Sequence, residues 1–227
     1  MKKIFFLFLL ISFLIENTSV AHIKHYNNIK YLKYNIYFND DYVGFHILNF
    51  KRNGNYLEVK GNGNFSISKL GIDLINYKTS TSALYKDNQL IKFNSETLQN
   101  DKKKYVNVEL EDNSLLINGS SYNGKAEKDL MMSSLWNHEI IKKKQQISSV
   151  SGRVINQKVN FLGKKKILIN NQSYNAINFH IFSDNDKSMN KKKINIKIWY
   201  DTKTLLWLKA SYKKFGNLEY RLHKVKY

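Results

Sequence analysis

Histidine and aromatic side chains are the groups of this chain that could perform chemistry or bind a ligand. The six histidines are His22, His25, His46, His138, His180 and His223. His138 lies in the run Trp136–Glu139, where an indole, an amide, an imidazole and a carboxylate follow one another. This run can line a cleft, but neighbours in sequence are not thereby an acid–base pair in space. We therefore assign no catalytic residue from the sequence.

Several chemistries are excluded by residues and motifs that the sequence lacks. The chain has no Cys, which excludes disulfides, zinc ribbons and a cysteine nucleophile. Hydrolase elbows, H-E-x-x-H helices, P-loops and G-x-G-x-x-G turns are also absent from the sequence. His22 and His25 could hold copper near a processed N-terminus, but nothing in their spacing favours a metal site. The sequence thus predicts no cofactor and no metal.

Aromatic residues are abundant, with 3 Trp, 15 Tyr and 13 Phe. Aromatic side chains favour strands and cross-strand pairs, so a packed core is one explanation. The other is an apolar groove inside a curved sheet, which could hold an acyl chain. For the second case, the candidate ligand-binding residues are Trp136, Asn137, His138, Trp199 and Tyr200.

The N-terminus has the three parts of a secretory signal peptide. Lysines at positions 2 and 3 precede the apolar run Ile4–Ile15, and small residues follow at Ser19–Ala21. The run is shorter than the roughly 20 residues that span a bilayer. We expect cleavage after Ala21 and a single exported domain over 22–227, most simply in a bacterial periplasm. No transmembrane segment is expected after cleavage.

The chain is strongly basic, with a formal net charge of +19 at pH 7. All basic residues except Arg52, Arg153 and Arg221 are lysines, whereas nucleic-acid readers favour arginine. Four lysine triplets, 102–104, 142–144, 164–166 and 191–193, lie beside predicted strands or a helix end, where lysines protect sheet edges. Export and the lysine bias predict no nucleic-acid partner. An amphiphile, a lipid or an anionic envelope glycan remains, and the oligomeric state is left open.

Alternating apolar and polar residues predict an all-β protein. Leu32, Tyr34, Ile36 and Phe38 share one face, and similar alternation recurs to the end of the chain. The pairs Asn39-Asp40, Asn53-Gly54 and Asp112-Asn113 predict tight turns between antiparallel strands. Gly61 and Gly63 predict a bulge or bend. We expect a large curled antiparallel sheet, or an open barrel or sandwich.

One segment does not alternate and predicts a short helix near 133–144. Ser133 or Ser134 could cap its N-terminus, and the lysines 142–144 would lie at its C-terminal end, as the helix dipole favours. Trp136, Ile140 and Ile141 would form its buried side.

Two aromatic stretches and a third near the N-terminus resemble a known family. They are Ser133–Asn137, then Ile198–Asp201 with Leu206–Leu208 and Gly216–Leu222, and Tyr42–Phe45 near the start. This order resembles the exported proteobacterial family called domain of unknown function 6134, although Asn217 stands where that family usually has Ser. The resemblance implies an all-β exported fold and carries over no catalytic residue.

Three functions remain open on the sequence. The first is a non-catalytic binder of an amphiphile or cell-envelope component. The second is an enzyme acting on an envelope glycan or lipid through carboxylates or His138. The third is a structural or interaction module that docks on an anionic surface through its lysines. A continuous apolar cavity would favour the first function.

Overall fold

The computed structural model describes residues 26–227, except residues 70, 184–193 and 214–215. The predicted signal peptide, His22, His25 and the lysine triplet 191–193 therefore lie outside the described residues. Within the part that is described, no helix is long and apolar enough to cross a bilayer.

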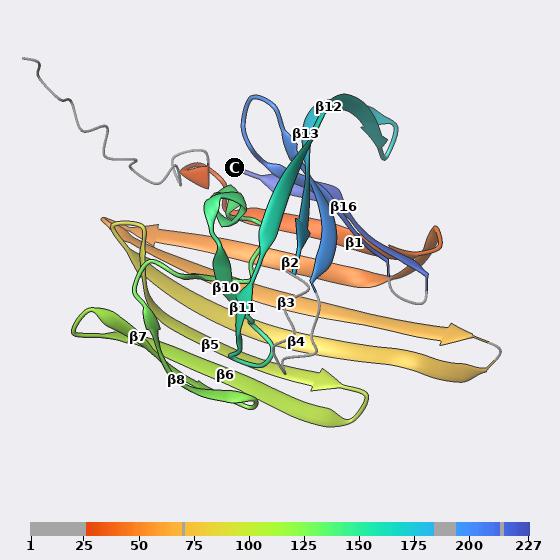
Figure 1. The fold of residues 1–227 in the computed structure, drawn as a ribbon. Coiled ribbons are helices and arrows are strands. Elements are labelled where there is room, and N and C mark those ends of the chain that lie inside the picture. The colour runs from red at the N-terminus through yellow and green to blue at the C-terminus, as the bar shows by residue number, and fades with distance from the viewer. Residues whose placement is uncertain (1–25, 70, 184–193, 214–215) are drawn as a thin grey trace, which may run out of the picture.

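The fold is a single large antiparallel sheet with a small three-stranded sheet beside it (Figure 1). The large sheet has 13 strands in the order β12-β13-β14-β15-β16-β1-β2-β3-β4-β5-β6-β7-β8. Its strands are β1 (Tyr31–Phe38), β2 (Asp41–Asn53), β3 (Tyr56–Lys69), β4 (Ile72–Lys86), β5 (Gln89–Gln99), β6 (Lys102–Glu111), β7 (Ser114–Gly119), β8 (Tyr122–Glu127), β12 (Lys158–Ile169), β13 (Gln172–Phe182), β14 (Asn195–Asp201), β15 (Trp207–Lys213) and β16 (Asn217–Lys226). The sheet is curled but not closed, because β12 and β8 do not pair with each other. The predicted all-β fold and open curled sheet are confirmed.

Apolar side chains alternate along the strands as the sequence predicts. Leu32, Tyr34 and Ile36 of β1 are completely buried, and Val106 and Val108 of β6 are almost so. Successive side chains of a strand point to opposite faces, so this alternation gives each strand one buried face. The inner faces of the curled sheet thus form the core.

Asn, Asp and Gly residues make the tight turns. Asn39 and Asp40 have φ of 49° and 71° between β1 and β2, and Gly54 has φ of 57° between β2 and β3. Positive φ is costly for most residues but tolerated by Asn, Asp and Gly. The predicted turns at Asn39-Asp40 and Asn53-Gly54 are confirmed.

The bulge predicted at Gly61 and Gly63 is wrong. The β2–β3 and β3–β4 registers pass through both residues without a shift, and the irregularity in β3 lies instead between Ile67 and Ser68. A side chain at Gly61 would collide with Thr81, and one at Gly63 would press on the ring of His46. These glycines therefore make room for neighbouring side chains.

Residues 128–157 cross the inner face of the sheet rather than extending it. They contain β9 (Met131–Met132), the 3-10 helix η2 (His138–Lys142), β10 (Gln145–Ile147) and β11 (Val154–Asn156). The predicted short helix is thus present, but as a single 3-10 turn capped by Asn137 and not by Ser133 or Ser134. The side chain of Ser133 is used elsewhere, since its Oγ accepts a hydrogen bond from the backbone N–H of Ser149 at 2.8 Å.

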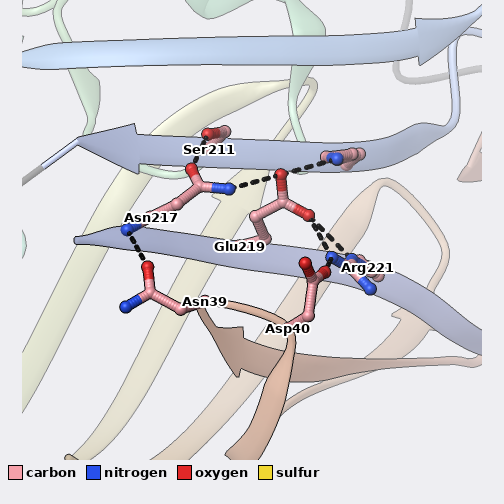
Figure 2. A network of polar contacts seen from close by, with 7 residues as sticks. Asn39, Asp40, Ser211, Asn217, Glu219 and Arg221 are labelled. Carbon is pink, nitrogen blue, oxygen red and sulfur yellow. Dashed lines mark hydrogen bonds and ion pairs between the residues drawn. The ribbon is translucent and has the colours of Figure 1, made fainter.

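A polar network on the other face joins the β1–β2 turn to β15 and β16 (Figure 2). The carboxylate of Glu219, 6% exposed, accepts hydrogen bonds from Arg221 Nε at 2.7 Å and Asn217 Nδ2 at 3.0 Å. It also pairs with Lys209 Nζ at 2.7 Å. Arg221 reaches on to Asp40, so charges of both signs alternate through the network.

His46 makes unfolding sensitive to pH. Its ring lies on the inner face of β2, 6.1 Å from the ring of Tyr220 and 6.5 Å from that of Trp207. Desolvation lowers the pKa of His46 to about 4. An unfolded chain, with a His pKa near 6.5, therefore binds more protons than the folded one between these two values.

We expect the contribution of His46 to stability to be fully present above about pH 6.5 and lost as the pH falls towards 4. The loss should be about 3 kcal/mol in the free energy of unfolding, at about 1.4 kcal/mol for each pH unit between the two pKa values. Urea titrations at a series of pH values should show this slope for the wild type and a flatter one for His46→Gln. Parallel curves for the two proteins would contradict the assignment.

Candidate functional site

The 128–157 segment is held against the sheet by hydrogen bonds to β5, to β14 and to the turn between β7 and β8. Ser95 Oγ donates to the carbonyl of Ser149 at 2.6 Å, and Tyr200 Oη donates to that of Leu135 at 2.9 Å. The backbone N–H of Ser121, beside β8, donates to the carbonyl of Ser151 at 3.1 Å. A side chain at Gly119 of β7 would collide with the backbone of residues 151–152, so glycine permits this close approach.

Trp136 is the largest side chain of this segment and fills the space inside the sheet. It is 2% exposed, and its ring meets those of Tyr26 at 5.4 Å, Phe50 at 5.2 Å and Tyr85 at 6.0 Å in edge-to-face contacts. Edge-to-face contacts of this kind are favourable beyond the apolar area they bury. The groove that the sequence predicts inside the sheet is here occupied by the chain's own aromatic residues.

The next three residues form a compact polar turn. Asn137 Oδ1 accepts a hydrogen bond from the backbone N–H of Glu139 at 3.1 Å. Glu139 Oε1 lies 3.1 Å from His138 Nε2 and 2.9 Å from Lys142 Nζ. The ring of His138 is 6.3 Å from that of Tyr200. An imidazole and a carboxylate predicted only as neighbours in sequence are therefore in contact.

The fold brings four of the five predicted ligand-binding residues together and separates the fifth. Trp136, Asn137, His138 and Tyr200 lie where the segment meets the inner face. Trp199 precedes Tyr200 in the same strand, so its side chain points to the opposite face. There its ring lies between Lys165 Nζ at 5.3 Å and Lys209 Nζ at 5.4 Å, as a cation–π contact on each side.

Two adjoining hollows flank the segment. The first, of about 470 Å³, is lined by Tyr85, Asp87, Asn88, Gln89, Leu90, Lys128, Asp129, Leu130, Met131, Met132, Asn137, Glu139 and Lys143. The second, of about 1010 Å³, is lined by Glu127, Asp129, Leu130, Ile141, Lys142, Lys143, Lys144, Gln145, Asn156, Gln157, Lys158, Val159 and Asn160. We call the two hollows together the seam, because residues of both edge strands, β8 and β12, line the second of them.

An ion pair separates the two hollows. Asp129 and Lys143 line both, and Lys143 Nζ lies 2.7 Å from Asp129 Oδ2. The hydrogen bond from Lys143 lowers the pKa of Asp129. An anionic group that entered the seam would compete with Asp129 for this ammonium.

The lining of the seam mixes apolar side chains with lysines and with the carboxylates of Asp87, Glu127, Asp129 and Glu139. Leu90, Leu130, Met131, Ile141 and Val159 supply apolar surface in the two hollows. No group of three or more His, Asp or Glu side chains among the described residues is placed to hold a metal ion. Such a surface can take an apolar chain along its walls and an anionic group at its lysines.

Sequence reasoning identified Asn137 at the seam but missed the other residues of its lining. Lys143 belongs to a triplet interpreted as protecting a sheet edge, and Asp129 lies 14 residues before it. Asp129 and Lys143 come together only because the 128–157 segment runs between the edge strands β8 and β12. The position of the lysine triplet after a short helix was the sole available signal.

Comparison with known families identifies the family to which most of the chain belongs. Residues 34–223 match the family model described as "Domain of unknown function (DUF6134)", which confirms the resemblance expected from the aromatic stretches. No curated protein matches the chain.

Two solved structures are similar in fold. A β-barrel-like protein of domain of unknown function DUF1849 from Brucella abortus has 10% identity and a TM-score of 0.58, covering 86% of this chain and 96% of that one. A Bacteroides fragilis protein with a YmcC-like fold has 11% identity and a TM-score of 0.37, covering 87% of this chain and 95% of that one. The similarity to the Brucella structure supports the fold alone.

Proposed function

We propose that this chain, which belongs to the family described as domain of unknown function DUF6134, is a non-catalytic binder of an anionic amphiphile of the cell envelope. The binding site would be the seam. The observation that carries this proposal is the Asp129–Lys143 ion pair at the junction of two hollows whose linings mix apolar with charged side chains.

The filled interior determines where the ligand would lie. Trp136 is buried inside the sheet, so an acyl chain would lie at the margin of the core, against Leu130, Met131 and Ile141. Its anionic head group would take the place of Asp129 beside Lys143, within reach of the exposed Lys142 and Lys144. Asn137 would line the site. Trp136, His138 and Tyr200 would pack beneath the lining, against the inner face of the sheet.

The ion pair gives a test in which two substitutions act in opposite directions. Asp129→Asn removes the competing carboxylate, and we expect affinity for a fluorescent fatty-acid analogue to rise two- to fivefold, as loss of a partly exposed pair allows. Lys143→Gln removes the cation, and we expect affinity to fall by a similar factor. Fluorescence titration of the purified chain measures both.

The matched control is the exposed pair of Lys92 and Glu109 on β5 and β6, whose charged atoms are 3.0 Å apart. Lys92→Gln and Glu109→Gln change the net charge equally but should leave the affinity unchanged. The methyl ester of the probe should respond to none of the four substitutions. Equal effects at the control pair, or no binding of the acid by the wild type, would refute the proposal.

Export through the cleaved signal is the second part of this proposal. It is supported by the lysines, the apolar run Ile4–Ile15 and the small residues up to Ala21. N-terminal sequencing of protein recovered from the periplasm should begin at His22. Recovery of an intact Met1 from the cytoplasm would refute it.

A further inference from the structure

The strand β12 forms one of the two margins of the large sheet and differs from the other margin. Within the described residues it pairs with β13 only, which leaves the N–H and C=O groups of its outer side without a strand partner (Figure 1). At 12 residues it is twice as long as β8, the strand at the opposite margin. Long free edges are unusual, because they attract further strands.

The lysines of β12 and the bulge between Phe161 and Gly163 give its edge part of the usual protection, but large apolar side chains are exposed beside them. Phe161, Leu162 and Leu168 are 59%, 46% and 70% exposed. The opposite edge, β8, has the sequence YNGKAE, and its one large side chain with apolar surface, Tyr122, is partly buried. Apolar side chains exposed beside a free backbone edge provide surface that an added strand would cover.

The charge of β12 has one sign. Its sequence, KVNFLGKKKILI, contains four lysines and no carboxylate. Two copies of β12 paired side by side would bring the lysine triplets 164–166 close together, which disfavours self-association. An acidic strand would instead meet complementary charges along the edge.

We propose that β12 accepts an extended acidic segment of a partner protein as a fourteenth strand of the sheet. Backbone hydrogen bonds along the free edge would supply affinity. Lys164 and Lys166 would select acidic side chains, while Phe161 and Leu168 would pack against apolar residues of the partner. This interaction goes beyond amphiphile binding, and the four side chains named lie outside the lining of the seam, whereas Lys158, Val159 and Asn160 of the same strand belong to that lining.

The probe is a synthetic ten-residue peptide with Glu at the two central positions of one face, Val at the outer positions of that face and Thr on the other face, because Lys164, Lys166 and Leu168 share one face of β12. Fluorescence polarisation is the readout. We expect it to bind, and the same peptide with Lys in place of Glu not to bind. N-methylation of every second residue, which removes backbone donors, should abolish binding. Hydrogen exchange should show that the peptide protects amides of residues 158–169.

Matched variants of the full chain locate the site. Lys164→Gln with Lys166→Gln should weaken binding about tenfold at low salt, because two complementary charges are lost. Lys102→Gln with Lys103→Gln, from a triplet on the interior strand β6, should not weaken it. Phe161→Ser with Leu168→Ser should weaken it at any salt concentration. Asp129→Asn should have no effect, which separates this proposal from amphiphile binding.

Three outcomes would overturn the proposal. N-methylated and unmodified peptides that bind equally would show that backbone pairing is absent. Binding of anionic phosphatidylglycerol vesicles through Lys164 and Lys166, without competition from the peptide, would assign the edge to a lipid surface. Sedimentation of the wild type as a dimer that Phe161→Ser dissociates would assign it to self-association.

Discussion

Replacing Trp136 with alanine is expected to lower the free energy of unfolding by about 4 kcal/mol. The side chain is 2% exposed and touches rings that come from β2, from β4 and from the start of the described chain. Truncation leaves a cavity that the rigid strands around it cannot close, and a cavity adds to the loss of apolar burial. Urea unfolding followed by far-ultraviolet circular dichroism measures the change.

Two further variants separate packing from other roles of Trp136. Trp136→Phe keeps most of the ring contacts, and we expect it to cost about half as much as the alanine variant. Trp199→Ala removes an indole from the opposite face, where it packs between two lysines, and should cost less than Trp136→Ala. A cost below about 1 kcal/mol for Trp136→Ala would mean that the 128–157 segment is not packed as a core element.

Replacing Glu219 with alanine is expected to cost about 3 kcal/mol. The substitution leaves Lys209 and Arg221, whose side chains are 23% and 25% exposed, beside each other without their shared carboxylate. Breaking a buried pair by removing one partner costs about 3–5 kcal/mol, and partial hydration of the two cations places the expected value at the lower end. The control is Glu58→Ala, which removes an exposed pair with Lys60 and should cost less than about 0.5 kcal/mol.

The difference in the free energy of unfolding between the wild type and Glu219→Ala should change with pH in a defined direction. Burial alone would raise the pKa of Glu219, but hydrogen bonds from Lys209, Asn217 and Arg221 outweigh it and lower the pKa from 4.5. The stabilisation is therefore fully present above about pH 4.5 and is lost as the pH falls through the lower, folded-state pKa. In urea titrations, the stability difference between the wild type and Glu219→Ala should shrink steadily as the pH falls below about 4.5. A constant difference down to pH 3 would show that packing, not charge, accounts for the cost.

Prediction from sequence succeeded where the physical cause is local. Alternation of apolar and polar residues determines which face of a strand is buried, so Leu32, Tyr34 and Ile36 could be assigned to the core in advance. Turns at Asn39-Asp40 and Asn53-Gly54 were also predictable, because the positive φ they require is available to few residue types.

Prediction failed where the cause is a contact between distant residues. Gly61 and Gly63 were predicted to form a bulge or bend, yet the register runs through them without a bulge, and they accommodate Thr81 and His46, which only strand pairing brings next to them. Likewise, either serine at 133 or 134 was as good a helix cap as Asn137 by residue type alone. The path of the segment over the sheet engages the side chain of Ser133 with Ser149 and leaves Asn137 to cap.

The amino-acid sequence by itself determined that this protein is a large antiparallel β structure, because periodicity and turn chemistry act over a few residues at a time. Only the tertiary structure decided that Trp136 fills the interior, that Asp129 meets Lys143 at the seam, and that Trp199 faces away from Tyr200's neighbours. The tertiary structure also determines that β12 lies at one edge of the large sheet. These features depend on which strands lie side by side, and that choice minimises the exposed apolar surface of the whole chain at once.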